Sequence, residues 1–298
     1  MTTALLRARL LMQAIAAAAG CHHPHGAALA GPVLWACLDA SRRNVYCEDV
    51  RWDSVLRQPV NTLSNFPFAL GALHQLVLGR ADLRAWRAHG PAAAAAERSS
   101  ELARYPFFTL CSAAAQLWVA CGSSFFHGSW TRAGQQADIG AVYAVLLCPV
   151  LYVAQRLGLL GPGDAHCSFG SALLAITAAL TAFKWRIKSS IVVPALIGAL
   201  VGLLALWFRV GSPMVSQPDC LRRWLLGPVQ RERPRGLQQP LLFAAAIAIG
   251  LAFAATAHDM TLRGCNPRSL FQWHAVWHLF AAFSLELLNR FLRSEAPR

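Results

Sequence analysis

The stretch SSIVVPALIGALVGLLALWF (residues 189–208) decides the fold class, because it runs for 20 residues without a charged side chain. A helix needs about 20 consecutive apolar residues to cross the hydrocarbon core of a bilayer. The run is too long for a strand, and it lacks the alternation of apolar and polar residues typical of membrane barrels. It therefore predicts a membrane-spanning helix.

Further apolar runs of similar length accompany this one along the chain. The chain of 298 residues is 56% hydrophobic and only 14% charged, and a soluble domain of that composition could not cover its surface with polar groups. We therefore expect an all-α integral membrane protein, a seven-transmembrane helix bundle with a small N-terminal extramembrane cap. The seven expected spans are residues 59–80, 106–127, 136–157, 168–184, 189–208, 239–258 and 270–291.

The expected organisation has three parts: an N-terminal tail and cap (1–58), a seven-helix transmembrane catalytic domain (59–291) and a C-terminal tail (292–298). Arg7 and Arg9 precede LLMQAIAAAAG (10–20), a pattern typical of a signal peptide. A short interfacial helix or an additional first span fits that segment equally well. The histidines of CHHPH (21–25) are interpreted as part of a solvated tail, with adventitious metal binding as the alternative.

The net charge of +13 does not indicate a nucleic-acid partner, because the arginines are scattered through the loops between spans. Leaving the long N-terminal tail aside, the loops and span ends on one side carry 6 Lys/Arg against 15 on the other. Since cytoplasmic loops are enriched in Lys and Arg, we expect a non-cytoplasmic N-terminus and a cytoplasmic C-terminus. An organelle membrane and a bacterial inner membrane both fit this topology, and no obligate protein partner is implied.

Ionisable residues gather at one level of the predicted bundle. His127 ends the second span, Asp138 opens the third, and His274 and His278 open the seventh. With alternating spans, all four lie at the non-cytoplasmic end. His274 and His278 are spaced i, i+4, as are Ser123 and His127, so each pair shares one helix face. Taken singly, the histidines could bond neighbouring helices and Asp138 could cap its helix; the shared depth favours a common site.

Three neutral imidazoles suit a zinc ion and leave one coordination position open for water. Bound zinc lowers the pKa of that water to about 7. Asp138 could then orient the water and accept its proton, and the Ser123 hydroxyl could stabilise an oxyanion. This chemistry is hydrolysis of an amide or an ester bond in a lipid.

Four stretches together resemble the alkaline ceramidase family, within the wider superfamily of seven-span metal hydrolases. They are YCED (46–49), NTLSN (61–65), GSSFFHGSWTRAGQQADIG (122–140) and HAVWH (274–278). The resemblance implies zinc ligands at His127, His274 and His278, with Ser123 and Asp138 as catalytic residues. It also implies hydrolysis of the N-acyl amide of a ceramide-like membrane lipid, releasing a fatty acid and a sphingoid base.

The resemblance further implies a calcium site and a disulfide. Glu48 and Asp49 match part of the family's acidic calcium cluster, but Gln58 stands where the family has a glutamate. With carboxylates missing, calcium is expected to bind poorly. Cys47 matches a cysteine of the family disulfide, and Cys265 is its expected partner, with two free thiols as the alternative. Two other functions stay open: hydrolysis of another acyl lipid, and a non-enzymatic seven-span receptor with a structural zinc.

Overall fold

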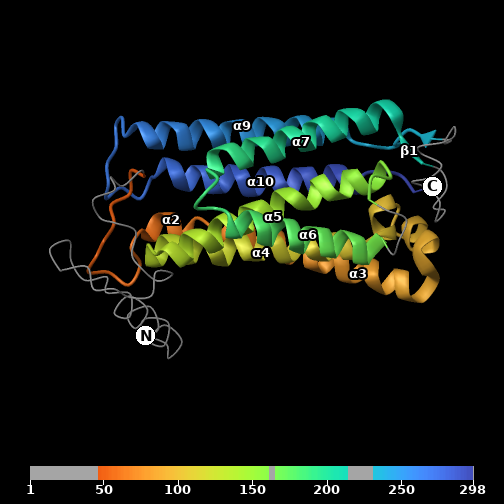
Figure 1. Ribbon diagram of the computed structural model, residues 1–298, viewed down its shortest axis with the longest axis horizontal. Helices are drawn as coiled ribbons and strands as arrows, with labels where there is room; N and C mark the ends of the chain where they lie inside the picture. Colours follow the sequence, from red (N-terminus) through yellow and green to blue (C-terminus); the bar gives the residue numbers. More distant parts are fainter. Residues whose placement is uncertain (1–45, 161–164, 214–230, 298) are drawn as a thin grey trace. The chain divides into compact units, whose positions relative to one another are not determined.

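The computed structural model describes residues 46–160, 165–213 and 231–297. The signal-like segment (10–20) and CHHPH (21–25) lie outside this described part. Seven helices of 18 residues or longer make up most of what is described, which confirms the all-helical prediction (Figure 1). They are α3 (Phe66–Glu97), α4 (Pro106–Ser129), α5 (Arg132–Arg156), α6 (Ala165–Ala182), α7 (Ser189–Val210), α9 (Gln239–Thr261) and α10 (Trp273–Arg293).

Shorter elements connect these helices. A five-residue helix, α2 (Pro59–Leu63), precedes α3, and a 3₁₀ turn, η1 (Glu101–Arg104), precedes α4. The strands in the described part are β1 (Ser212–Pro213) and β2 (Arg231–Glu232), which form one antiparallel pair. A pair this short closes a loop and contributes no sheet layer to the fold.

Four of the long helices, α4, α5, α7 and α9, are long and apolar enough to cross a membrane. The others fall short for reasons visible in their sequences. In α6, the apolar stretch whose side chains are described is Phe169–Ala182, which is short for a crossing. Charged residues interrupt the other two helices: α3 carries Arg80, Asp82 and Arg84, and α10 carries Glu286 and Arg290. Several crossings are therefore supported by length and composition alone.

The first expected span, 59–80, differs most from the structure, because it is broken into α2 and α3 around Ser64 and Asn65. The break coincides with Pro67, which has no backbone N–H to continue the hydrogen bonds of α2. The helix then continues well past residue 80, to Glu97. Gly90, with φ of 81°, interrupts it through a left-handed conformation that suits glycine, and Pro91 restarts it.

The described chain packs as two compact units. The first comprises residues 46–69, 118–141 and 246–284, and the second comprises 70–117, the described residues of 142–245, and 285–297. In the first unit, Val50 from the segment before α2 packs with Phe126 and Trp130 from the end of α4. All the expected metal-site residues belong to this unit.

The second unit contains a buried network of ion pairs. The Arg156 guanidinium donates to Glu101 Oε1 at 3.1 Å and to Glu295 Oε1 at 2.6 Å, and Arg293 Nη2 donates to Asp82 at 2.6 Å. Buried charges are costly unless they are paired in this way. Because Glu295 is fully buried, the network holds the beginning of the expected C-terminal tail (292–298) against the helices.

Candidate metal centre

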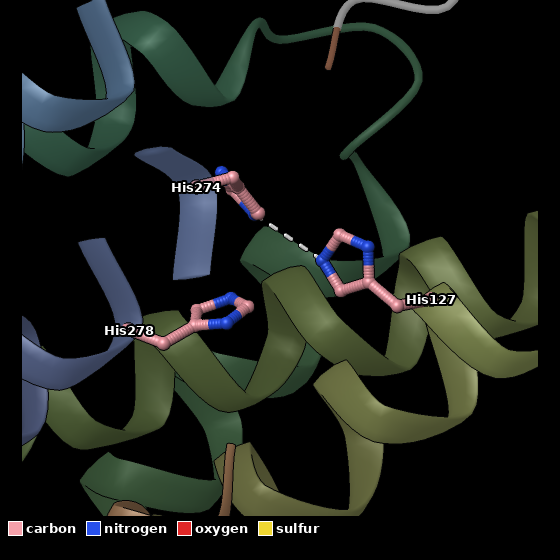
Figure 2. A group of neighbouring side chains, drawn as sticks. All are labelled: His127, His274 and His278. Carbon is pink, nitrogen blue, oxygen red and sulfur yellow. Dashed lines mark hydrogen bonds between the residues drawn. The ribbon is translucent and has the colours of Figure 1, made fainter. Parts of the chain in front are cut away.

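Three histidines from two helices meet inside the first unit. His127 lies in the last turn of α4, while His274 and His278 lie in the first two turns of α10. Figure 2 shows the three rings facing one another, and one nitrogen from each lies within 4.8 Å of the others. Their exposed fractions are 0%, 7% and 3%. The structure thus brings together the three side chains that the spacing had placed at one level.

The cluster has the dimensions of a metal site. His127 Nε2 and His274 Nε2 lie 3.2 Å apart. At Zn–N distances of about 2.0–2.1 Å, two nitrogens of a tetrahedral site stand about 3.3 Å apart. Within the described residues, no second group of three or more His, Cys, Asp and Glu side chains meets the same criterion. The donor set and its spacing therefore fit a bound metal ion.

Two polar side chains contact the outer nitrogens of the rings. Gln58 Oε1 lies 2.7 Å from His127 Nδ1, and Ser64 Oγ lies 2.7 Å from His278 Nδ1. Such second partners fix the orientation of metal-binding imidazoles. Sequence reasoning did not assign these roles, because the partners lie 69 and 214 residues apart and no local spacing links them.

Aromatic rings shield the cluster. The Tyr46 ring lies 4.1 Å from the His274 ring and 5.4 Å from the His127 ring, and Phe68 lies 6.3 Å from His278 (centroid distances). Burial raises the pKa of the Tyr46 phenol above its usual value, and the charges of Asp138 and Asp259 raise it further. The phenol therefore keeps its proton and remains a hydrogen-bond donor beside the histidines.

The two expected catalytic residues lie on neighbouring turns of α4 and α5. Ser123 is buried, with 2% exposed, one turn before His127 on the same face of α4. Asp138 is half-buried in the second turn of α5. The helices touch here, since a Cβ added to Gly122 would stand 3.0 Å from the Ala137 carbonyl oxygen and 3.3 Å from the Asp138 nitrogen. This close approach holds the turn of Ser123 against the turn of Asp138.

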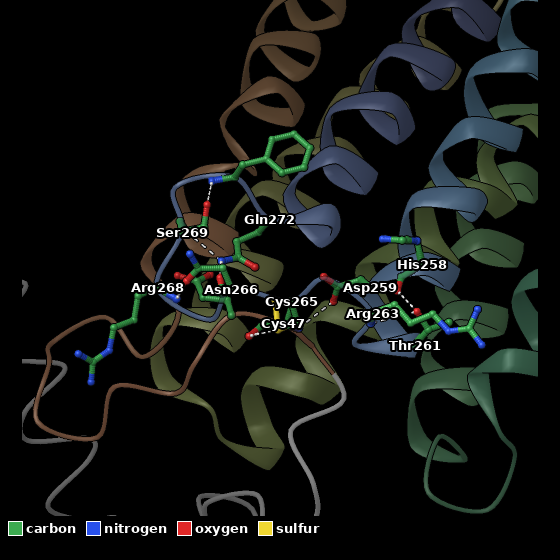
Figure 3. The surroundings of a disulfide bond; sticks show 12 residues. Cys47, His258, Asp259, Thr261, Arg263, Cys265, Asn266, Arg268, Ser269 and Gln272 are labelled. Carbon is green, nitrogen blue, oxygen red and sulfur yellow. Dashed lines mark hydrogen bonds between the residues drawn. A yellow bond between two sulfur atoms is a disulfide. The ribbon is translucent and has the colours of Figure 1, made fainter.

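A disulfide joins Cys47 to Cys265, the pair that the resemblance implied (Figure 3). The backbone N–H of Cys47 also donates to Asp259 Oδ2 at 3.1 Å, and Asp49 N–H donates to the Pro267 carbonyl at 3.1 Å. These contacts hold the segment before α2 against the last turn of α9 and the loop that follows it. A cavity of about 100 Å³ lies beside the disulfide and is lined by both cysteines.

The two carboxylates expected as a calcium-site remnant lie in different environments. Glu48 is fully buried, and its carboxylate accepts hydrogen bonds from the backbone N–H groups of Val60 and Asn61 at 2.9 and 2.8 Å. It thereby neutralises unpaired donors at the start of α2. Asp49 is exposed. Glu48 therefore serves as a helix cap, and the expected poor binding of calcium stays a prediction.

No family model, curated protein or solved structure matches this chain. The fold and the site by themselves define a class: a helical protein with several helices able to cross a membrane and a buried three-histidine cluster that could hold a metal ion. The family resemblance rests on the four short stretches alone.

Proposed function

We propose that this protein is a zinc-dependent hydrolase of the N-acyl amide bond in ceramide-like membrane lipids. The observation that carries the proposal is the buried convergence of His127, His274 and His278, with two Nε2 atoms 3.2 Å apart. Three neutral nitrogen ligands are typical of catalytic zinc, which keeps an open fourth position. A structural site would close that position, and the cluster within the described residues contains three potential ligands.

Bound zinc would supply an activated water and a Lewis acid. The neighbouring side chains would transfer the proton and stabilise the developing negative charge. Asp138 accepts the proton of the attacking water and later returns it to the amine leaving group, as general base and then general acid. Ser123 donates its hydroxyl hydrogen to the amide oxygen as negative charge develops there. The amide bond is cleaved to a carboxylic acid and an amine.

The proposed membrane arrangement has seven crossings. The first is formed by α2 and α3, and the rest are α4, α5, α6, α7, α9 and α10. The excess of Lys and Arg on one side favours a non-cytoplasmic N-terminus and a cytoplasmic C-terminus. A reaction centre within a helical bundle lets a lipid approach from the side, while the aromatic rings around the histidines exclude bulk water. This arrangement suits a substrate that never leaves the bilayer.

Purified protein tested on a lipid panel, with and without a chelator, decides the proposal. We expect metal in the preparation, release of fatty acid and sphingoid base from ceramide, and loss of that release on chelation, with recovery on adding Zn²⁺. Faster cleavage of ester lipids than of ceramide would replace the substrate by another acyl lipid. Bound metal without cleavage of any acyl lipid would exclude an enzyme and favour a receptor.

A further inference from the structure

Gln58 contacts the end of α4 through both its backbone and its side chain. Its backbone N–H donates to the His127 carbonyl at 3.0 Å, and that of Arg57 donates to the Gly128 carbonyl at 3.1 Å. The last carbonyl groups of a helix have no partners within it, so these two N–H groups cap α4 directly at the candidate ligand. The Gln58 side chain then contacts the imidazole of the same His127, at 2.7 Å.

The hydrogen bonds of Gln58 determine which way round its amide lies. Its Nε2 donates to the Glu48 carbonyl oxygen at 2.8 Å. A carbonyl only accepts, so the NH₂ group must lie on that side. The amide oxygen therefore faces His127 Nδ1 at 2.7 Å and also accepts from Asn61 Nδ2 at 3.3 Å.

The orientation of the amide determines which ring nitrogen of His127 carries the hydrogen. Since Oε1 of Gln58 only accepts, the Nδ1 atom of His127 must carry the hydrogen. In the neutral ring the lone pair then lies on Nε2, the atom 3.2 Å from His274 Nε2. Gln58 thus presents His127 in the one tautomer that can bind a metal ion within the cluster.

The contact between Ser64 and His278 lacks this property. Ser64 Oγ lies 2.7 Å from His278 Nδ1 and 2.9 Å from the Asn61 carbonyl oxygen. A hydroxyl both donates and accepts, so its hydrogen can go to either neighbour and both tautomers of His278 are satisfied. Of the two side-chain contacts to the Nδ1 atoms, from Gln58 and from Ser64, the one from Gln58 selects a tautomer and the one from Ser64 does not.

We propose that Gln58 is a positioning residue for the metal ligand His127. The inference rests on the metal centre of the proposed function. The backbone and the amide of Gln58 together hold the His127 ring in place and keep its Nε2 unprotonated. The imidazole therefore loses little further conformational entropy when a metal ion binds. Loss of such an outer partner weakens metal binding about 10- to 100-fold.

The position of Gln58 is in turn set by the segment before it. The Glu48 carbonyl that accepts from Gln58 belongs to a residue whose carboxylate is bound by the start of α2. The adjacent Cys47 is bonded to Cys265. The disulfide, the Glu48 cap and the Gln58 amide therefore form one continuous connection to His127.

The test measures Co²⁺ and Zn²⁺ affinity of the full chain by competition with a chelator. Gln58→Leu removes the acceptor and should weaken both metals about 10- to 100-fold, with an altered absorption spectrum of bound Co²⁺. Gln58→Glu keeps an oxygen acceptor for Nδ1–H but loses the donor to the Glu48 carbonyl, and should weaken binding less than Gln58→Leu does. Gln116→Leu, at an equally buried glutamine about three turns before His127 on α4, is the matched control and should bind as the parent protein does.

The outcomes separate the two proposals. A parent protein that binds neither metal overturns the metal centre and the proposed function with it. A parent that binds metal while Gln58→Leu binds equally well overturns only the role of Gln58. If Gln58→Leu does not fold, Gln58→Glu decides: a loss as large as that of His127→Ala would show that the oxygen acceptor is not what matters, and would overturn the inference.

Discussion

His127 and His274 lie 147 residues apart in the chain, yet their Nε2 atoms are 3.2 Å apart. One ring comes from the end of α4 and the other from the beginning of α10, and both are buried. In the structure the two rings contact each other through these nitrogens, at a spacing that also suits two ligands of one tetrahedral zinc ion. The following predictions test the proposal that a metal ion binds there.

Replacing His278 by alanine should abolish metal binding and hydrolysis together. His278 is one of the three proposed ligands, and a site with two imidazoles would no longer satisfy the coordination of zinc. Metal content of the purified variant and release of fatty acid from ceramide are the two measurements. His89→Ala, at an exposed histidine, is the control and should retain both. Unchanged metal stoichiometry in His278→Ala would remove this residue from the ligand set.

Replacing Asp138 by asparagine should leave the metal in place and slow turnover about 10²- to 10⁴-fold, the usual contribution of a positioned general base. The substitution keeps the shape of the side chain but removes its ability to accept a proton. Metal analysis and the rate of amide hydrolysis are measured on the same preparation. Normal turnover in Asp138→Asn would reduce this aspartate to a helix cap.

The long helices and the shared helix face of His274 and His278 could be predicted from the sequence because both depend on local regularities. An apolar run of about 20 residues predicts a helix wherever it packs, and an i, i+4 spacing places His274 and His278 on one face. The break at Ser64 and Asn65 and the long extension of α3 to Glu97 were missed. They depend on a proline position and on a glycine with positive φ, which interrupt or restart a helix without changing its apolar content.

The residues that contact the three histidines could not be predicted from the sequence, for a different reason. Gln58, Ser64 and Tyr46 have no spacing that relates them to a histidine, and only the tertiary fold brings them there. Gln58 was noted solely as a departure from a family pattern. The structure gives a physical reason for glutamine at this position. Its amide donates to the Glu48 carbonyl and accepts from His127 at the same time, whereas a carboxylate could only accept.

Replacing Gly122 by alanine should lower both stability and turnover. The added Cβ would lie 3.0 Å from the Ala137 carbonyl oxygen, and because this is backbone, we expect α4 and α5 to move apart by a few tenths of an ångström. Overpacking of this kind costs about 1–3 kcal/mol and moves Ser123 away from Asp138. Thermal unfolding and turnover are compared with those of Gly198→Ala, where an added Cβ has nothing within 4 Å. Equal behaviour of the two variants would mean that this contact does not set the geometry of the site.

Removing the Cys47–Cys265 disulfide should lower both the stability of the protein and its affinity for metal, although neither cysteine is one of the proposed ligands. The double variant Cys47→Ser, Cys265→Ser frees the segment that carries Glu48 and caps α2, so thermal stability should fall by about 2–5 kcal/mol.

Metal affinity should fall with it, because the Glu48 carbonyl no longer holds the Gln58 amide against His127. Reduction of the unaltered protein should have the same effect, since it breaks the same bond; the adjacent cavity is lined by both cysteines. Cys121→Ser, at an exposed free cysteine, controls for loss of a thiol. If the double variant is less stable but binds Zn²⁺ as tightly as the parent, the disulfide supports the fold and the connection through Glu48 does not reach the metal ligand.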